Sequence, residues 1–588
     1  MDQLEDTNFD IIVVGTGLIE SIVAGSLARS GKKVLHLDSN KQYGSNWSAF
    51  NIKHLIEWEQ DLKKNAQTLS KKDTNYIDYT TTYKQNFKEV ELLFNKDNSN
   101  IESITLDTSI LPDTNETTLY QAIKDTFDNF INTTSPSLPS SERNDYIQPF
   151  LDTLTEKAMK EEQQNGGIYD LTAYILQLKT LLHTLKQSRF YNVDTTPKIL
   201  PSRGDLVEIL IKSGVGRYME FKSVDDMFIF DVDTQKLEKV PGSKEDIFVN
   251  KSISLIDKRK LMKFLTFTMN EEKDADIISE KFKITGKLQS AVIHALALSR
   301  SDVTAKVGLE QIQSFMKSIG RFGKGAYLCT LYGGGSEISQ AFCRICAVYG
   351  GVYILGQALE KYIIHEESGL CTGIMTSDNQ EFTASHIITG LDYISPSWMT
   401  DSIDNSSIWV SRAVIVTDQP LSGLSQEEQN QSLGISVIPP NDTIGNKNES
   451  IYVLNQNSET MACPKDQYIT YLWTLNTEES SSTSLKNVAQ ILLSNSTSVN
   501  ENNEDENKDK ELKPKHAIFE LYYQQRIRSM EQALEKWKIP KNIYVCSDPD
   551  ISIDFENATK EAKSIFYKCV NDDVEFLPPA EEVEPEDF

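Results

Sequence analysis

The sequence is short of features that mark several protein classes. Its 588 residues include only seven cysteines, an odd number spread thinly, which argues against a disulfide framework and for a reducing compartment. Lys and Arg number 59 against 86 Asp and Glu, and this net charge of −27 argues against nucleic-acid binding. No apolar run is long enough to span a membrane, and the first residues form no secretory signal. We therefore expect a cytoplasmic protein, in the cytosol, whose electric field favours basic partners.

Catalytic and metal-binding patterns are also missing. The seven histidines are scattered, and no Ser-His-Asp, Cys-His or paired-carboxylate arrangement can be recognised in the sequence. Cys343 and Cys346 form the only Cys-x-x-Cys, with no second pair, so packing in the core is favoured over a zinc site. The sequence predicts no catalytic residue and no metal.

The N-terminal region carries most of a dinucleotide-binding pattern. An apolar strand leads into Gly15 and Gly17, a helix follows, and a second strand ends at Asp38, where an adenosine ribose would be held. The third glycine of the pattern is replaced by Glu20. A carboxylate there is stabilised by the helix dipole and opposes a diphosphate at the same N–H groups. This predicts an α/β fold whose nucleotide site is vestigial, although Asp38 fits equally a residue that caps the next turn.

The composition changes along the rest of the chain. Polar, irregular sequence with sparse helix-like pieces alternates with apolar residues at helical or strand spacing. We predict a large domain in four parts (1–60, 194–255, 326–475 and 513–570), a polar insertion (61–193), a helical domain (256–325), a low-complexity loop (476–512) and a disordered acidic tail (571–588).

One predicted helix, from about 337 to 348, separates polar from apolar residues. Glu337, Gln340 and Arg344 recur at i, i+3 and i+7 and form a polar stripe. Such a stripe fits either an interface with another protein or a solvated face. The preceding Gly333–Gly335 is able to cradle an anion, but it lacks the Lys-Ser/Thr of a P-loop.

The glycine-bearing loop before that region is basic. Arg321 and Lys324 lie within the run Gly-Arg-Phe-Gly-Lys-Gly. These two side chains suit a phosphate, a membrane surface or an acidic partner, and they also suit plain solubility.

Several blocks of the sequence resemble one known superfamily, that of the Rab escort proteins and GDP-dissociation inhibitors. The motifs follow the family's order from residue 9 to the C-terminus, with 61–193 and 476–512 not covered. The resembling blocks are Gly-Thr-Gly-Leu-Ile-Glu-Ser (15–21), Lys-Val-Leu-His-Leu-Asp (33–38), Tyr-Gly-Ser-Asn-Trp-Ser-Ala-Phe (43–50), Arg-Tyr-Met-Glu-Phe-Lys (217–222), Arg-Phe-Gly-Lys (321–324) and Glu337 through Tyr353.

The resemblance implies a fold and a function. The fold would be a large domain built like flavin monooxygenases, but without flavin, plus a small all-helical domain. Such proteins are not enzymes: they bind newly made, GDP-bound Rab GTPases and present their C-terminal cysteines to the type II geranylgeranyltransferase, an alpha/beta heterodimer. They then carry the geranylgeranylated Rab to membranes, which they contact transiently.

The resemblance also assigns roles to residues of this chain. The Rab-binding platform would comprise Tyr43, Glu337, Gln340, Arg344 and Tyr353, and the family's mobile loop near the delivery surface would contain Arg321 and Lys324. The helix at 204–213 would grip the apolar motif of the Rab tail. The helices at 256–320 would dock the transferase and shelter the prenyl chain.

Within the superfamily the escort branch fits better. The chain is long, has Asn46-Trp47 after the Tyr-Gly turn, and ends in an escort-like Glu575-Phe-Leu-Pro-Pro. The alternatives are a dissociation inhibitor that recycles prenylated Rabs and, more remotely, a flavin-dependent oxidoreductase. Two departures from the family pattern are Ser45, which replaces a glycine, and one additional residue in the loop before Glu337.

Overall fold

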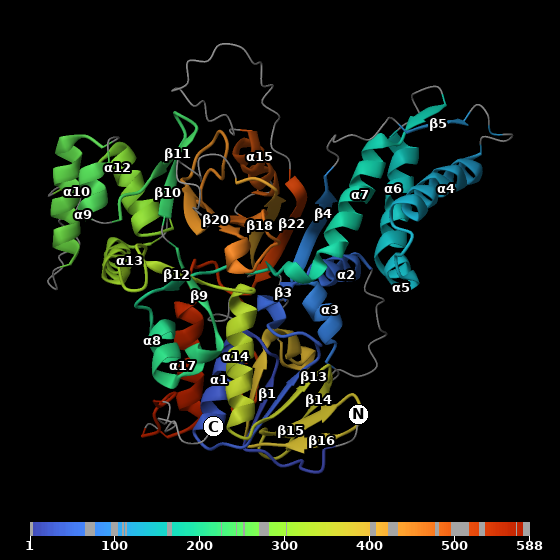
Figure 1. Cartoon of the computed structure of the whole chain (residues 1–588). Helices are drawn as coiled ribbons and strands as arrows, with labels where there is room; N and C mark the ends of the chain where they lie inside the picture. Colours follow the sequence, from blue (N-terminus) through green and yellow to red (C-terminus); the bar gives the residue numbers. More distant parts are fainter. Residues whose placement is uncertain are drawn as a thin grey trace, which may run out of the picture.

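Two large sheets organise the protein, one in the lower and one in the upper half of Figure 1. The computed structural model describes residues 4–64, 77–95, 104–108, 111, 115–161, 167–224, 226–242, 244–250, 253–269, 282–300, 303–399, 407–420, 433–476, 481–494, 517–528, 536–571 and 573–579.

The lower sheet is parallel and contains the N-terminal βαβ unit. Its strand order is β13-β2-β1-β17-β23, with every pairing parallel. All residues of β1 and β2 are buried because helices cover one face of the sheet and a smaller sheet covers the other. The strands are β1 (Ile11–Val14), β2 (Val34–Asp38), β13 (Val352–Leu355), β17 (His386–Gly390) and β23 (Ile543–Cys546).

Three helices pack together on one face of this sheet. They are α1 (Leu18–Arg29), α14 (Gly334–Val348) and α17 (Glu556–Cys569). Helices α1 and α14 approach closely at Gly25, where an added Cβ would lie 2.9 Å from the carbonyl oxygen of Phe342. The predicted strand-helix-strand start and the predicted helix with the polar stripe are confirmed.

The upper sheet has eight strands and is mainly antiparallel. Only the pairing of β10 with β19 is parallel. In spatial order the strands are β11 (Lys236–Lys239), β10 (Asp226–Asp231), β19 (Leu433–Ile438), β20 (Ile451–Asn457), β21 (Tyr468–Asn476), β18 (Ile408–Thr417), β22 (Ala517–Ile527) and β4 (Phe87–Phe94).

The remaining strands form short sheets. The sheet β14-β15-β16 covers the second face of the parallel sheet. The short strands are β3 (Ala49–Phe50), β5 (Thr105–Asp107), β6 (Ile168–Asp170), β7 (Val193–Asp194), β8 (Leu200–Pro201), β9 (Phe221–Val224), β12 (Tyr327–Thr330), β14 (Leu359–Ile364), β15 (Cys371–Thr376) and β16 (Glu381–Thr383).

A helical module lies at the upper left of Figure 1; most of it falls within the range predicted for a helical domain (256–325), but its first helix, α9, precedes that range. Its apolar residues join the core of the upper sheet. The module comprises α9 (Lys244–Val249), α10 (Leu255–Thr268), α12 (Gly286–Ser290), the π-helix η7 (Ala291–Leu296) and α13 (Ala305–Ser318). Helix α8 (Asp205–Ser213) and the 3₁₀ turn η5 (Val215–Tyr218) lie in the lower half, near α14 and α17.

The stretch 61–193 differs from the expected irregular insertion, because much of it is helical. Helices α4, α6 and α7 extend at the upper right of Figure 1, and strand β4 forms the edge of the upper sheet. On α4 the buried residues Ile123, Phe127 and Ile131 recur every four positions. This helical spacing was not recognised in the sequence because the residues between them are mostly polar. The helices within it are α3 (Tyr79–Lys84), α4 (Glu116–Thr134), α5 (Ser140–Glu142), α6 (Gln148–Glu161) and α7 (Thr172–Lys186), and the preceding α2 (Ile52–Lys63) ends in its first residues.

Two further predictions of irregular structure are partly wrong. Within 476–512, α15 (Ser481–Ser494) packs four buried residues, Leu485, Val488, Ala489 and Leu492, against the upper sheet. Within the tail 571–588, Phe576 and Leu577 are buried beside α17. Residues 495–512 and 580–588 lie outside the described residues.

Within the part of the chain that the structure describes, no helix has both the length and the apolar character needed to cross a membrane. The predicted boundaries between domains stay predictions.

Candidate functional site

The turn between β1 and α1 has the backbone of a nucleotide-binding turn. Gly15 has φ of +102°, a left-handed conformation that favours glycine, and Gly17 precedes the first residue of α1. The carboxylate of Glu20 lies against Gly17 and Gly390, so the space beside this helix N-terminus is occupied by the chain itself. Burial raises the pKa of Glu20 to about 8, and its own backbone N–H opposes the shift.

The ribose position of the pattern is also occupied by protein groups. Asp38 accepts hydrogen bonds from the Thr16 backbone N–H (2.6 Å) and hydroxyl (2.5 Å), and from the Asn40 N–H (2.7 Å). The hydroxyls of Ser45 (3.1 Å) and Tyr393 (3.0 Å) donate to it as well. Burial raises the pKa of Asp38, and these donors limit the shift. Both carboxylate oxygens are therefore engaged inside the fold.

Little space remains beside Glu20 at the start of α1. The cavity lined by Gly17, Glu20, Asn46, Asp392 and Asp548 has a volume of about 20 Å³. That volume suits about one water molecule and no dinucleotide. The residues at this turn therefore do not fit a flavin dinucleotide in the present conformation.

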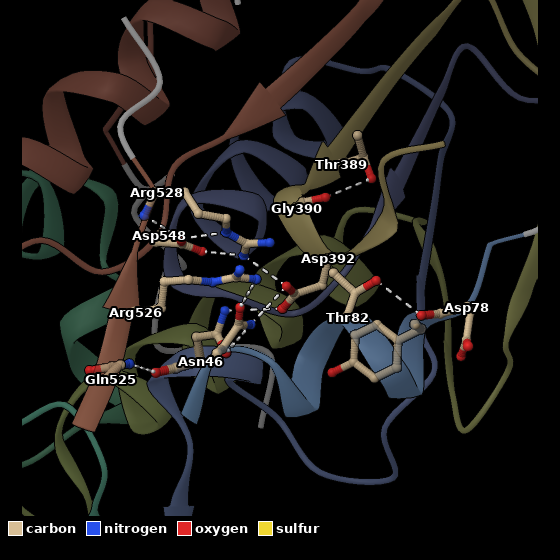
Figure 2. A network of polar contacts seen from close by, with 12 residues as sticks. Asn46, Asp78, Thr82, Thr389, Gly390, Asp392, Gln525, Arg526, Arg528 and Asp548 are labelled. Carbon is tan, nitrogen blue, oxygen red and sulfur yellow. Dashed lines mark hydrogen bonds and ion pairs between the residues drawn. The ribbon is translucent and has the colours of Figure 1, made fainter. Parts of the chain in front are cut away.

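A buried charge network closes the other side of this cavity (Figure 2). The Arg528 guanidinium donates to Asp548 (2.6 and 2.7 Å) and to Asp392 (2.7 Å), and all three side chains are at most 5% exposed. Asp392 also accepts from the amides of Asn46 (3.1 Å) and Asn86 (2.8 Å). Since Arg528 follows β22 and Asp392 follows β17, the network joins the two large sheets.

The N-terminus of α14 is occupied in the same manner. Asp194, at the end of β7, lies against Gly334, and the backbone N–H of Gly335 stabilises its charged form. Its other oxygen accepts from the Thr196 N–H at 2.8 Å. Burial raises the pKa of Asp194 to about 7. The anion that this glycine run cradles is thus a side chain of the protein.

The outer surface of α14 carries the predicted polar stripe. Gln340 and Arg344 are exposed, and Glu337 is half-buried, which raises the pKa of its carboxyl. The Arg344 guanidinium lies 4.3 Å from the ring centre of Tyr218 in η5, a half-exposed aromatic residue that the sequence did not single out.

The two predicted platform tyrosines lie together beside this helix. The rings of Tyr43 and Tyr353 stack with centres 5.5 Å apart and planes 13° from parallel. The turn at Gly44 lies against Ser336 in the first turn of α14. The fold therefore gathers residues separated by about three hundred positions into one region, with a polar helix face beside an aromatic pair.

The basic loop that contains Arg321 and Lys324 is held to the rest of the fold through Arg321. Arg321 donates to the carbonyl of Ser202 (2.6 Å) and pairs with Glu208 on α8. Lys324 and Phe322 are exposed. The assignment of Arg321 and Lys324 to a mobile loop stays a prediction.

No group of three or more His, Cys, Asp or Glu side chains that could hold a metal ion occurs among the residues described above. All seven cysteines are buried and unpaired.

Comparison with known proteins gives a consistent family. The family model described as GDP dissociation inhibitor matches residues 4–100 and 171–496. The chain is 31% identical to "Rab proteins geranylgeranyltransferase component A 2" of Mus musculus, covering 97% of each chain. It is also 25% identical to "Rab escort protein 1" of Arabidopsis thaliana, over 99% of this chain and 97% of that one.

A solved structure shares the fold. The Rab GDI of Plasmodium falciparum superimposes with a TM-score of 0.59 over 97% of this chain and 100% of that chain, at 19% sequence identity.

Proposed function

The chain belongs to the GDP dissociation inhibitor family, in the branch of component A of Rab geranylgeranyltransferase, and from this premise we propose that it is a Rab escort protein. It binds newly made Rab GTPases in their GDP form and presents their C-terminal cysteines to the alpha/beta transferase. It then delivers the geranylgeranylated Rab to membranes. The observation that carries the proposal is the similarity to component A over nearly the full length of both chains.

The geometry supports a binding role without catalysis. Polar groups at the nucleotide turn are satisfied internally by Glu20, Asp38 and their partners, whereas Gln340 and Arg344 are exposed. We propose that Tyr43, Tyr353 and the face of α14 form the Rab-binding platform, and that no flavin is bound. A purified protein that retains flavin absorbance after dialysis would contradict this.

The need for a carrier follows from the chemistry of the product. A geranylgeranyl chain has about 20 carbons, and at roughly 0.8 kcal/mol per CH₂ its exposure to water costs on the order of 10 kcal/mol. A cytosolic escort that shelters the chain removes most of that cost until a membrane is reached. Contact with membranes is then transient.

Reconstitution separates an escort from a recycling inhibitor. Purified transferase, a GDP-bound Rab and labelled geranylgeranyl diphosphate are mixed with and without this chain. An escort makes lipid transfer depend on its presence and saturates with its concentration. Lipid transfer that proceeds equally without the chain, together with extraction of prenylated Rab from vesicles, would favour the recycling inhibitor.

A further inference from the structure

Three aromatic rings in successive contact run from the inside of the parallel sheet to the proposed Rab-binding platform. His36 on β2 is fully buried, and the strand register places it beside Tyr353 on β13. Their ring centres are 5.6 Å apart in an edge-on arrangement. Tyr353 in turn stacks on Tyr43 at 5.5 Å. The half-buried Tyr43 thus rests on the half-buried Tyr353, which in turn contacts the fully buried ring of His36.

The orientation of His36 is fixed by its two ring nitrogens. Its Nε2 lies 2.7 Å from the carbonyl oxygen of Gly15, and because a carbonyl only accepts, Nε2 carries the proton. Nδ1 then faces the Sγ of Cys343 on α14 at 3.9 Å. Burial lowers the pKa of His36 to about 4, so the ring is neutral at physiological pH.

Through these contacts the turn between β1 and α1 also holds the ring of His36 in place. The carbonyl that accepts from His36 belongs to Gly15, the residue of this turn that has a left-handed backbone conformation. An aromatic ring held between a carbonyl and a thiol cannot reorient, and its edge-on contact limits the positions open to Tyr353. Pre-ordering a partner-binding side chain lowers the entropy lost on association.

We propose that His36 is a positioning residue of the partner surface: anchored on the Gly15 carbonyl, it fixes Tyr353 and, through it, Tyr43. The inference rests on the proposed platform and adds a buried residue that contacts no partner. The turn inherited from a nucleotide-binding fold then serves as the foundation of a protein-binding surface.

The test measures the affinity of a GDP-bound Rab by calorimetry for His36→Ala, His36→Phe and Leu35→Ala. Leu35 is the control because it is equally buried on the same strand but packs in the opposite core, away from Tyr353. We expect His36→Ala to weaken binding roughly 2- to 12-fold, the range of an aromatic pair. His36→Phe keeps the ring without its anchor and is expected to lose less, and Leu35→Ala lowers stability with unchanged affinity.

A double-mutant cycle distinguishes positioning from general destabilisation. In a background that carries both Tyr43→Ala and Tyr353→Ala, His36→Ala is expected to cause no further loss of affinity, because both rings that it positions are absent. A full loss in that background, or equal losses for His36→Ala and Leu35→Ala, overturns the proposal.

A readout in the free protein separates this inference from the platform itself. With fluorotyrosine incorporated, the Tyr43 signal is identified in fluorine NMR by its absence in Tyr43→Phe. His36→Ala should shift or broaden it, and Leu35→Ala should not. If Tyr43→Ala and Arg344→Ala both bind Rab normally, the platform assignment fails, yet the NMR comparison still decides whether His36 positions Tyr43. An unchanged Tyr43 signal in His36→Ala overturns the inference.

Discussion

The nucleotide turn and the outer face of α14 are neighbours in the fold, yet they use polar side chains in opposite ways. At the turn, Asp38 accepts hydrogen bonds from Thr16, Asn40, Ser45 and Tyr393, all from within the chain. On α14, Gln340 and Arg344 extend into solvent.

The difference shows how a ligand site can be closed while a surface stays available. A buried polar group must be paired, so a side chain that moves into a ligand's position has to satisfy the donors that the ligand would have used. Asp194 does this for the Gly335 N–H at the start of α14, and at the start of α1 Glu20 fills the space beside Gly17 and accepts from its own N–H. Exposed groups carry no such requirement and remain open to a partner.

The largest effect is expected from removing Arg528, the cation of the buried charge network beside the nucleotide turn. We expect Arg528→Met to lower the free energy of unfolding by about 3–5 kcal/mol, because Asp392 and Asp548 stay buried without their cation. Urea denaturation followed by circular dichroism measures the change. Arg321→Met removes a partly exposed ion pair, and a loss below about 1 kcal/mol is expected for this control. Equal losses would contradict the distinction.

The pH dependence of stability tests Glu20. Its folded pKa of about 8 exceeds the unfolded value near 4.5, so the folded state holds the proton more tightly. The contribution of Glu20 to stability is therefore full below about pH 4.5 and falls, by about 1.4 kcal/mol per pH unit, until the pH reaches about 8.

Glu20→Gln cannot ionise and is expected to lack this decline. The difference in unfolding free energy between the variant and the parent should grow in favour of the variant from pH 5 to pH 8. Asp194 and Glu556, with pKa values raised to about 7 and 6, contribute equally to both proteins and cancel in the difference. A difference that is constant with pH would show that Glu20 is not the titrating group.

The open surface is tested by binding. Tyr43→Ala and Arg344→Ala are each expected to weaken the affinity for GDP-bound Rab by about 1–3 kcal/mol, as for anchors at the centre of an interface. Arg344→Ala should leave the urea midpoint unchanged because its side chain is exposed, whereas Tyr43→Ala removes a half-buried ring stacked on Tyr353 and is expected to cost about 0.5–1.5 kcal/mol of stability. Calorimetry measures the affinity, and unchanged values for both variants would reject the platform.

The smallest effect is expected in helices α4 and α6, here called the helical arm, which lie outside the residues that the family model matches. Lys124 on α4 pairs with Asp152 on α6 at 3.1 Å in a partly exposed setting. Lys124→Ala is expected to cost at most about 1 kcal/mol of stability and to leave Rab affinity unchanged. A marked loss of affinity would extend the binding surface to the arm.

Local sequence patterns predicted the parts of the fold that depend on near neighbours. The glycine turn, the replacement by Glu20 and the polar stripe of α14 were all legible, because each is set by spacing of a few residues. The same reasoning missed the helices within 61–193 and 476–512, which were predicted to be irregular. In α4 and α15 a few apolar residues at helical spacing are enough to hold the helix in the fold, because residues from other parts of the chain bury them.

What the sequence alone determined is the family, the βαβ start and the identity of the acidic residue at its third glycine position. Only the tertiary structure decided that Asp194 fills the second glycine-rich helix start, that Arg528 spans Asp392 and Asp548, and that His36 lies under the tyrosine pair. These pairs join residues from 20 to more than 300 positions apart. Contacts of that kind arise from how sheets and helices stack, which no short-range pattern records.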